Sequence, residues 1–181
     1  KADSTTLDCI EHLGLREKLF GIKNFGIWDE ELIKDVGANA KMNEFQAAMG
    51  LCNLRHIDRE LAKRKAVVEH YNERLSGVNG LKISAPQKDV KPNYAYYPVI
   101  FEPEEFGKSR DEIYELLKVN EIYARKYFYP LTNTFECYKG MFDMGDTPVA
   151  LDLSKKVLTL PLYADLRIDQ VDRICLSLIH I

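Results

Sequence analysis

The sequence predicts an α/β protein in which a long helix is followed by a small α+β domain, a small sheet packed with helices. Apolar side chains recur at roughly helical spacing from Asn43 as far as Leu75. After Gly80, short β-branched and aromatic runs alternate with segments of helical pattern. We therefore divide the chain into residues 1–42, 43–80 and 81–181.

Residues 1–42 look unlike the start of an independent domain. A short helix is predicted at residues 7–19, and the glycines of 21–26 predict a turn, but no clear strand pattern follows. Little of this segment could form a core by itself. It is either a loosely attached extension or the tail of a larger domain.

The long helix is predicted over residues 43–80. Asn43 and Gln46 have the spacing of a capping box, and Gly77 and Gly80 mark the exit. Such a helix would be ~45 Å long at 1.5 Å per residue. Helices of this length often connect domains, and the charged middle of this one allows a bend.

The last third of the chain predicts short elements. Strands are expected at residues 81–84, 94–101, 122–126 and 157–160, and helices at 109–120, 149–156 and from Asp169 onward. Because proline lacks a backbone N–H, Pro98 indicates an edge or a bulge in the second of these strands.

Composition excludes several classes of function. Lys plus Arg is 25 and Asp plus Glu is 28, so the net charge of −3 gives no general attraction to nucleic acid or an anionic membrane surface. No apolar run approaches the ~20 residues of a membrane span, and residues 1–7 lack a signal-peptide core. The cysteines have no metal-site spacing, which predicts no metal and a reducing cytoplasm; they are Cys9, Cys52, Cys137 and Cys175.

A candidate anion site precedes the long helix. Gly37 allows an unusual backbone turn, Asn39 offers an amide donor and Lys41 offers a cation. A helix N-terminus just beyond them favours an anion such as phosphate. The alternative is that Asn39 only forms a turn and Lys41 is only solvated.

Residues 37–48 resemble the pattern G-x-N-x-R/K-M-x-x-x-Q-A-A of the DegT/DnrJ/EryC1/StrS family of PLP-dependent sugar aminotransferases. Further segments resemble the family in the same order, between about residues 19 and 178. They are residues 23–27, Asp58, Arg64 and 71–75 on the long helix, 94–99, 122–131 with Glu121 where glycine is common, and 158–162.

The resemblance implies the C-terminal part of a fold-type-I PLP aminotransferase. Residues 1–42 would be the tail of the large PLP-binding domain, 43–80 the connecting helix and 81–181 the small α/β domain. The residue matching Asn39 reaches the PLP phosphate of the neighbouring subunit in a homodimer. Lys41 would lie near the same anionic region; the family more often has arginine there, and lysine lacks its bidentate fork.

Residues 123–130 are basic and aromatic, and they supply candidate substrate-binding residues. Arg125 could meet a phosphate of a nucleotide sugar, and the ring of Tyr127 could stack on its base. The alternative is that these aromatic residues pack the core of the small domain. We expect the tyrosines of residues 94–97 to serve strand packing.

The resemblance also implies the reaction. The family moves an amino group, often from glutamate, to a nucleotide-linked keto sugar, here of 4-keto-6-deoxy type. It uses a Schiff-base lysine after a Ser-Phe pair, upstream of the segment matching Lys23, and that motif is absent. We therefore expect the chain to begin after that lysine, to hold no catalytic residue and to be inactive alone.

The sequence is also compatible with two other functions. A PLP-dependent sugar dehydratase of the same family has histidine in place of the Schiff-base lysine. A non-catalytic α/β domain could instead dimerise through the long helix.

Overall fold

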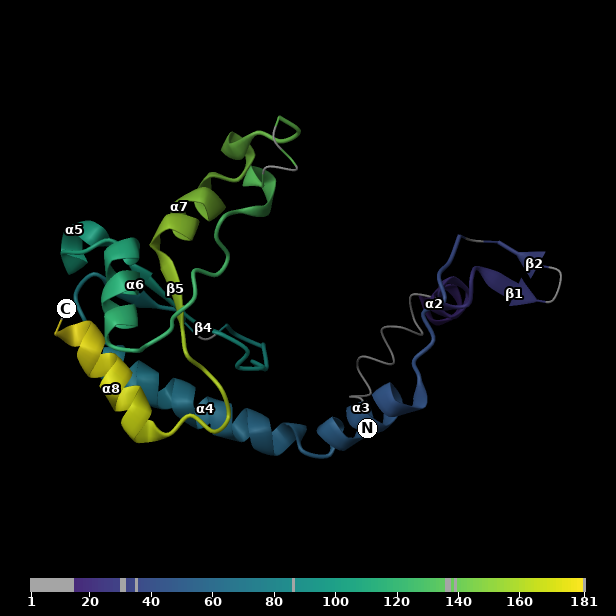
Figure 1. Ribbon diagram of the computed structural model, residues 1–181, viewed down its shortest axis with the longest axis horizontal. Coiled ribbons are helices and arrows are strands. Elements are labelled where there is room, and N and C mark those ends of the chain that lie inside the picture. Colours follow the sequence, from purple (N-terminus) through teal and green to yellow (C-terminus); the bar gives the residue numbers. More distant parts are fainter. Residues whose placement is uncertain are drawn as a thin grey trace. The chain divides into compact units, whose positions relative to one another are not determined.

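The computed structural model describes residues 15–29, 32–34, 36–85, 87–135, 138 and 140–180. The chain divides into two compact units, Lys1–Arg55 and His56–Ile181. The first unit contains α2 (Leu15–Lys23), β1 (Ile27–Asp29), β2 (Leu32–Ile33) and α3 (Glu44–Leu54), which are labelled in Figure 1.

The described residues of the first unit form almost no interior of their own. β1 and β2 form a two-stranded antiparallel pair in which Ile27 lies opposite Ile33. Among the described residues of this unit, only Gly21 and Gly26 are buried. The predicted helix at residues 7–19 falls partly outside the described residues, and its described part continues as α2 to Lys23.

The single helix expected over residues 43–80 is two helices. α3 ends at Leu54, and α4 begins at Ile57 and runs to Leu75, with Arg55 and His56 between them. Neither glycine nor proline marks this break, but it lies near the charged middle of the predicted helix, where the sequence allowed a bend. The capping box is confirmed: Gln46 N donates to Asn43 Oδ1 at 2.9 Å, and Asn43 N donates to Gln46 Oε1 at 3.0 Å.

The second unit is built on a three-stranded antiparallel sheet. β3 (Leu81–Ile83), β4 (Tyr97–Phe101) and β5 (Val157–Leu160) lie in the order β3-β4-β5. The strand expected at residues 122–126 is not formed as a strand. Only Arg125 pairs with the sheet, through a bridge to Thr159 on the side of β5 that faces away from β4.

Pro98 does not lie at an edge, since β4 is the central strand. Pro98 faces Thr159, whose N–H and carbonyl both bond to Arg125 on the far side of β5. Pro98 and Thr159 are therefore a non-hydrogen-bonded pair, and the nitrogen of Pro98 points toward β3. β3 has already ended at Ile83, opposite Val99, so the missing N–H breaks no ladder bond.

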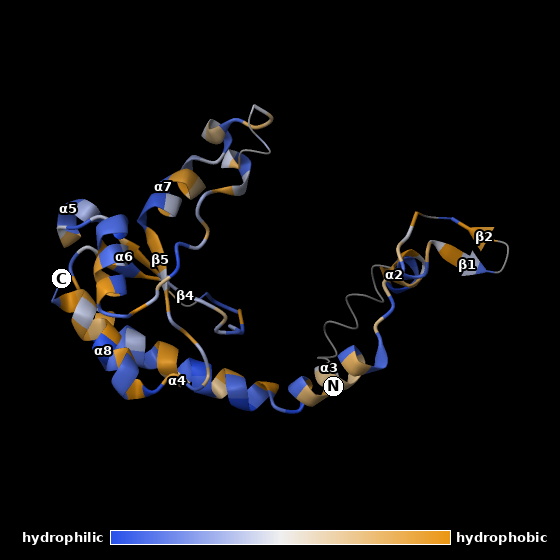
Figure 2. Ribbon diagram, viewed as in Figure 1, coloured by the Kyte–Doolittle hydropathy of each residue, from blue (hydrophilic) through white to orange (hydrophobic). Residues whose placement is uncertain are grey.

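The core of the second unit lies between one face of this sheet and three helices. These helices are α4 (Ile57–Leu75), α6 (Arg110–Val119) and α8 (Ile168–Ile179), with α8 beside α4 (Figure 1). Apolar residues of these elements form the core, and Figure 2 shows apolar residues in α8 and β5. The core includes Val67, Tyr71, Leu75, Val99, Phe101, Ile113, Leu117, Leu158, Leu160, Val171, Ile174 and Leu178.

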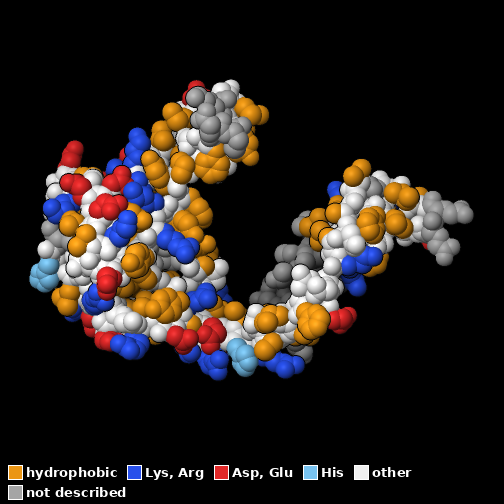
Figure 3. Space-filling view, in the orientation of Figure 1, with side chains coloured by type: hydrophobic (Ala, Val, Ile, Leu, Met, Phe, Trp, Pro, Cys, Tyr) orange, Lys and Arg blue, Asp and Glu red, His pale blue; other side chains and the backbone are white. Residues whose placement is uncertain are grey.

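Short elements complete the second unit: α5 (Pro103–Phe106), η1 (Thr132–Thr134), η3 (Met144–Asp146) and α7 (Pro148–Lys156). Apolar side chains are exposed over α7 and the segment before it (Figure 3); they include Met141, Phe142 and Val149. None of the helices in the described part of the chain combines the length and apolar character needed to cross a bilayer.

Candidate functional site

The predicted anion site lies in the first unit, on an extended segment that leads into α3. Residues 38–40 run beside residues 22–25, and Asn39 forms a bridge with Asn24. Backbone hydrogen bonds join the two segments: Ala38 N donates to Ile22 O, and Ala40 N donates to Lys23 O, both at 3.0 Å.

Gly37 is required here for a reason other than the one expected. Its backbone is not in the left-handed region. Instead, a Cβ at this position would lie 2.3 Å from the carbonyl oxygen of Ile22 and 2.5 Å from Gly26 N. Glycine therefore permits the close approach of two backbone segments, which fixes the start of the residue 38–40 segment.

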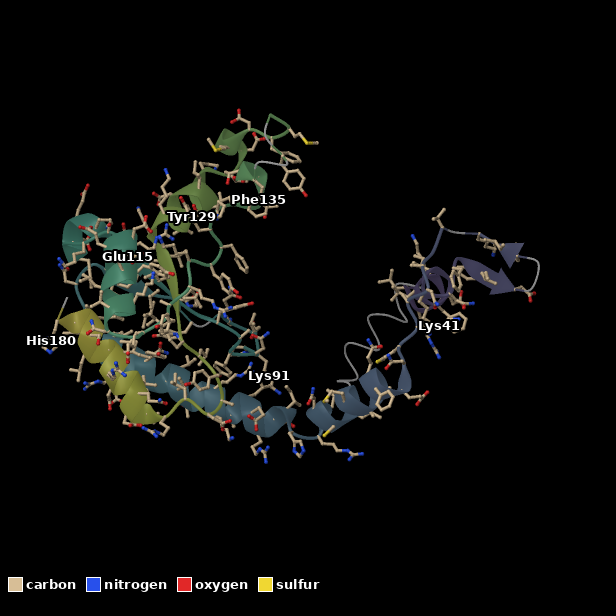
Figure 4. The ribbon with its side chains drawn as sticks, in the orientation of Figure 1. Lys41, Lys91, Glu115, Tyr129, Phe135 and His180 are labelled. Carbon is tan, nitrogen blue, oxygen red and sulfur yellow. The ribbon has the colours of Figure 1, made fainter. Side chains whose placement is uncertain are left out.

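Asn39 and Lys41 occupy alternate positions of this segment, so their side chains project from the same side of it. Both side chains are exposed, and Lys41, labelled in Figure 4, lies with its Nζ 5.5 Å from the centre of the Phe25 ring. An amide donor and a cation on one side of a fixed backbone suit a phosphate group.

The helix N-terminus contributes less than the sequence predicted. The capping box already occupies Gln46 N, and Glu44 places a carboxylate in the first turn of α3. A negative charge there stabilises the helix dipole but repels a further anion. The side chains of Asn39 and Lys41 are thus better candidates to bind a phosphate than the end of α3.

The second pair of predicted site residues lies in the second unit. Along residues 122–125, burial alternates: Ile122 and Ala124 are each 5% exposed and face the core, whereas Tyr123 and Arg125 face outward. This alternation is that of a strand, and the bonds between Arg125 and Thr159 extend it from the edge of the sheet.

Arg125 and Tyr127 contact each other directly. Arg125 Nη1 donates to Tyr127 Oη at 2.7 Å, and the guanidinium lies 5.5 Å from the centre of the same ring. The ring of Tyr127 stacks on Phe128 and meets Tyr96 edge-on, with centroids 5.0 and 5.6 Å apart. The pair therefore offers a cation beside an aromatic surface.

Arg125 and Tyr127 line an open cavity of about 360 Å³. Its other lining residues come from the segment just before β4, from residue 123, from β5 and from the loop that follows β5. They are Ala95, Tyr96, Tyr123, Thr159, Leu160, Pro161, Leu162 and Tyr163.

The structure contradicts the core-packing alternative for residues 123–130. Tyr123, Phe128 and Tyr129 are 70%, 68% and 52% exposed. The strand-packing prediction for residues 94–97 holds for Tyr97, which is buried, but is wrong for Tyr96, which is 54% exposed and lines the cavity.

Sequence reasoning missed the cavity tyrosines Tyr96, Tyr123 and Tyr163 as a group. The signal for Tyr123 was present in the alternation of residues 122–125, but Tyr96 and Tyr163 join only through the sheet. The structure brings Asn39 together with Lys41, and Arg125 together with Tyr127, in separate units. Within the described residues no cluster of His, Cys, Asp or Glu could hold a metal ion.

Characterised proteins resemble this chain along most of its length. It is 41% identical over 155 residues to the dTDP-4-amino-4,6-dideoxy-D-glucose transaminase of Escherichia coli, covering 84% of this chain and 42% of that protein. The Shigella dysenteriae protein of the same name is 37% identical, with 88% of this chain and 43% of that protein covered. The chain thus spans less than half the length of these relatives.

Solved structures agree on the fold. The structure of S. venezuelae DesV in complex with a ketimine intermediate matches with a TM-score of 0.81 and 24% identity, covering 92% of this chain and 43% of that one. DesI in the presence of its TDP-sugar product matches with a TM-score of 0.80 and 27% identity, covering 90% and 41%. The predicted fold class, a C-terminal portion of a PLP aminotransferase, is confirmed.

The family comparison covers nearly the whole described structure. The family model of the DegT/DnrJ/EryC1/StrS aminotransferases matches residues 11–179. That range includes both pairs of candidate site residues. The chain belongs to the DegT/DnrJ/EryC1/StrS aminotransferase family.

Proposed function

We propose that this chain is the C-terminal part of a cytoplasmic, PLP-dependent aminotransferase that moves an amino group from glutamate to the 4-keto carbon of a nucleotide-linked 6-deoxy sugar. The observation that carries this proposal is the 41% identity to a dTDP-4-amino-4,6-dideoxy-D-glucose transaminase, over 84% of the chain. The cavity beside Arg125, with its cation and its aromatic walls, supports a nucleotide-linked substrate.

Asn39 and Lys41 are the residues that would hold the cofactor's phosphate. The Asn39 amide would donate a hydrogen bond, and the Lys41 ammonium would neutralise part of the charge. The cofactor would supply an electron sink for the transfer of the amino group. The site would be shared across a homodimer, with these two residues serving the neighbouring subunit.

Arg125 and Tyr127 would hold the substrate. The Arg125 guanidinium would bind the diphosphate, and it is already oriented by the 2.7 Å bond to Tyr127 Oη. The exposed ring surfaces beside it would pack on the nucleoside. Both residues would therefore bind and orient the substrate and take no part in proton transfer.

The compared lengths support a division of the enzyme into two parts. The chain covers 42% of its E. coli relative, and the Ser-Phe-Lys motif of the family is absent from the sequence. We propose that the lysine bonded to PLP, the rest of the large domain and hence the chemical step lie outside this chain. The chain alone would then be inactive.

A chimeric enzyme tests the proposal. The part of the E. coli relative that precedes the matching region is joined to this chain, and amination of dTDP-4-keto-6-deoxy-D-glucose by glutamate is followed. We expect turnover by the chimera and none by the chain alone with PLP. Asn39→Ala should weaken PLP retention, while Asn79→Ala, a change of the same kind at a residue that bonds to the Glu105 carbonyl outside the proposed sites, should not.

A folded, dimeric chimera without turnover would contradict the assignment of substrate and donor. Turnover by the unjoined chain would contradict the proposed location of the catalytic lysine. Light scattering on the chimera measures the dimer directly, and a monomer that retains activity would refute the shared site.

A further inference from the structure

Arg110 is a buried cation that the proposed function does not use. It is the first residue of α6, and its side chain is 2% exposed. Its Nη1 donates to the carbonyl oxygen of Val157 at 3.3 Å, its Nε lies 2.8 Å from Asp111 Oδ1, and its guanidinium lies 4.7 Å from the centre of the Tyr129 ring. Burying a cation is costly unless it is paired, so the buried Arg110 depends on these contacts.

Asp111 extends the same cluster to a second point on the segment that holds Tyr129. Lys126 Nζ lies 2.5 Å from Asp111 Oδ1 and 4.6 Å from the centre of the Tyr114 ring. The hydrogen bond from Lys126 and the charge of Arg110 hold the pKa of Asp111 below its usual range. The N-terminal end of α6 therefore contacts residues 126 and 129 through charged groups.

These contacts bracket the candidate substrate-binding pair. Arg125 is fixed by two backbone bonds to Thr159, of 2.9 and 2.8 Å, and Lys126 is fixed by Asp111. Tyr129, labelled in Figure 4, is fixed by Arg110. Tyr127 and Phe128 lie between these points, and the exposed Phe128 ring shows that the core does not hold this stretch in place.

We propose that Arg110 is a positioning residue for the Arg125–Tyr127 pair, acting through the Tyr129 ring. The proposal rests on the function proposed above for that pair. By holding the far end of the segment, Arg110 keeps Tyr127 Oη within bonding distance of Arg125, and the guanidinium of Arg125 therefore faces the cavity before any ligand binds. The conformational entropy of the Arg125–Tyr127 segment is then lost on folding rather than on ligand binding.

A purely structural Arg110 would stabilise the fold without affecting the geometry of Tyr127. Nuclear magnetic resonance of the full 181-residue chain, labelled with ¹³C at the tyrosine ring, separates the two roles. The Tyr127 signal is assigned by its loss in Tyr127→Phe, and the Tyr71 signal reports on the core.

Three variants test the contact between Arg110 and the Tyr129 ring, one by changing Arg110 and two by changing Tyr129. Arg110→Met removes the cation but no aromatic ring, so any change in the Tyr127 signal reports a change of position and not a lost ring current. Tyr129→Leu removes the ring that Arg110 contacts, whereas Tyr129→Phe keeps it. Arg173→Met is the control for Arg110→Met, because Arg173 lies on α8 and donates to the carbonyl oxygen of Asn120.

We expect Arg110→Met and Tyr129→Leu to move the Tyr127 signal toward that of a free tyrosine while the Tyr71 signal stays in place. Tyr129→Phe and Arg173→Met should leave both signals unchanged. Tyr129 is half-exposed, so Tyr129→Leu is expected to fold; an unchanged Tyr127 signal in this variant would overturn the proposal even if Arg110→Met failed to fold.

Titration with dTDP tests the underlying function separately. Wild type should bind, Arg125→Gln should bind at least about tenfold more weakly, and Tyr129→Leu about fivefold more weakly, since the segment must then be ordered on binding. Absence of binding to wild type would refute the substrate role of the cavity, while the Tyr127 signal would still decide whether Arg110 positions it. Equal affinity of Tyr129→Leu and wild type would overturn the positioning role alone.

Discussion

Tyr71 contributes one hydrogen bond to the second unit that can be deleted almost without changing shape. Its side chain is fully buried, its ring stacks on Tyr97 with centroids 4.6 Å apart, and its hydroxyl donates to the carbonyl oxygen of Pro161 at 3.0 Å. Pro161 belongs to the cavity wall. Tyr71→Phe keeps the ring stack and removes only this connection between α4 and the loop after β5.

The expected cost follows from the surroundings of the acceptor. Pro161 is half-buried, so water can replace the lost donor in part, and the net value of an ordinary hydrogen bond applies, about 1 kcal/mol. With a urea slope of about 2 kcal/mol/M, the unfolding midpoint should fall by about 0.5 M. The slope itself should not change, because the surface exposed on unfolding stays the same.

Far-ultraviolet circular dichroism is the suitable probe, because the only tryptophan, Trp28, lies in the first unit. Tyr123→Phe is the matched control: the same oxygen is deleted from a side chain that is 70% exposed, and the midpoint should stay at the wild-type value. If Tyr71→Phe and Tyr123→Phe gave the same midpoint, the bond to Pro161 would contribute nothing to stability.

Three further predictions concern the same unit. Burial raises the pKa of both Tyr71 and Tyr97, so the folded state keeps protons that the unfolded state loses above pH about 10. The free energy of unfolding should therefore be unaffected below that pH and fall as the pH rises beyond it. Urea midpoints measured at alkaline pH would show this fall. Gly80→Ala should lower the free energy of unfolding by more than about 3 kcal/mol, because φ is +71° and the new Cβ would lie 2.2 Å from the backbone nitrogen of Phe106. Gly77→Ala, at φ +81° with open space around the new Cβ, should lower it by about 1 kcal/mol. Equal urea midpoints for the two variants would contradict this. Ser109→Ala removes the N-cap of α6 and should lower thermal stability by about 1 kcal/mol, with Ser109→Asn retaining most of it.

Local signals in the sequence predicted local structure well. The predicted capping box at Asn43 depends on residues three positions apart and is formed, and the helix predicted from residue 109 begins with Ser109 as its N-cap. The position of Pro98 depends instead on where β3 ends, which is a tertiary fact. Residues 122–126 were predicted as a strand, and the structure shows the alternating burial of a strand along residues 122–125, although only Arg125 forms a bridge with β5.

The candidate site likewise contains residues that the sequence identified and residues that only the fold brings to it. Residue chemistry singled out Arg125 and Tyr127, and the structure places them in contact. It could not single out Tyr96 or Tyr163, because each precedes or follows a strand and reaches the cavity only when β4 and β5 pair. Arg110 was equally hidden, since an arginine at the start of a helix is ordinarily solvated and only the fold buries it.

The exposed apolar residues of α3 support the proposal that other surfaces complete the site. Phe45 and Met49 lie on one side of the helix and Leu54 on the opposite side, and they are 87%, 63% and 63% exposed. A helix that is apolar on two sides is ordinarily buried on both, because exposing them to water forfeits the main driving force of folding. The exposed amide of Asn39 lies five residues before this helix, so the surfaces that cover α3 would also reach the phosphate-binding segment. Two covering surfaces, the large domain of the same subunit and the neighbouring subunit, are what the proposed shared site requires.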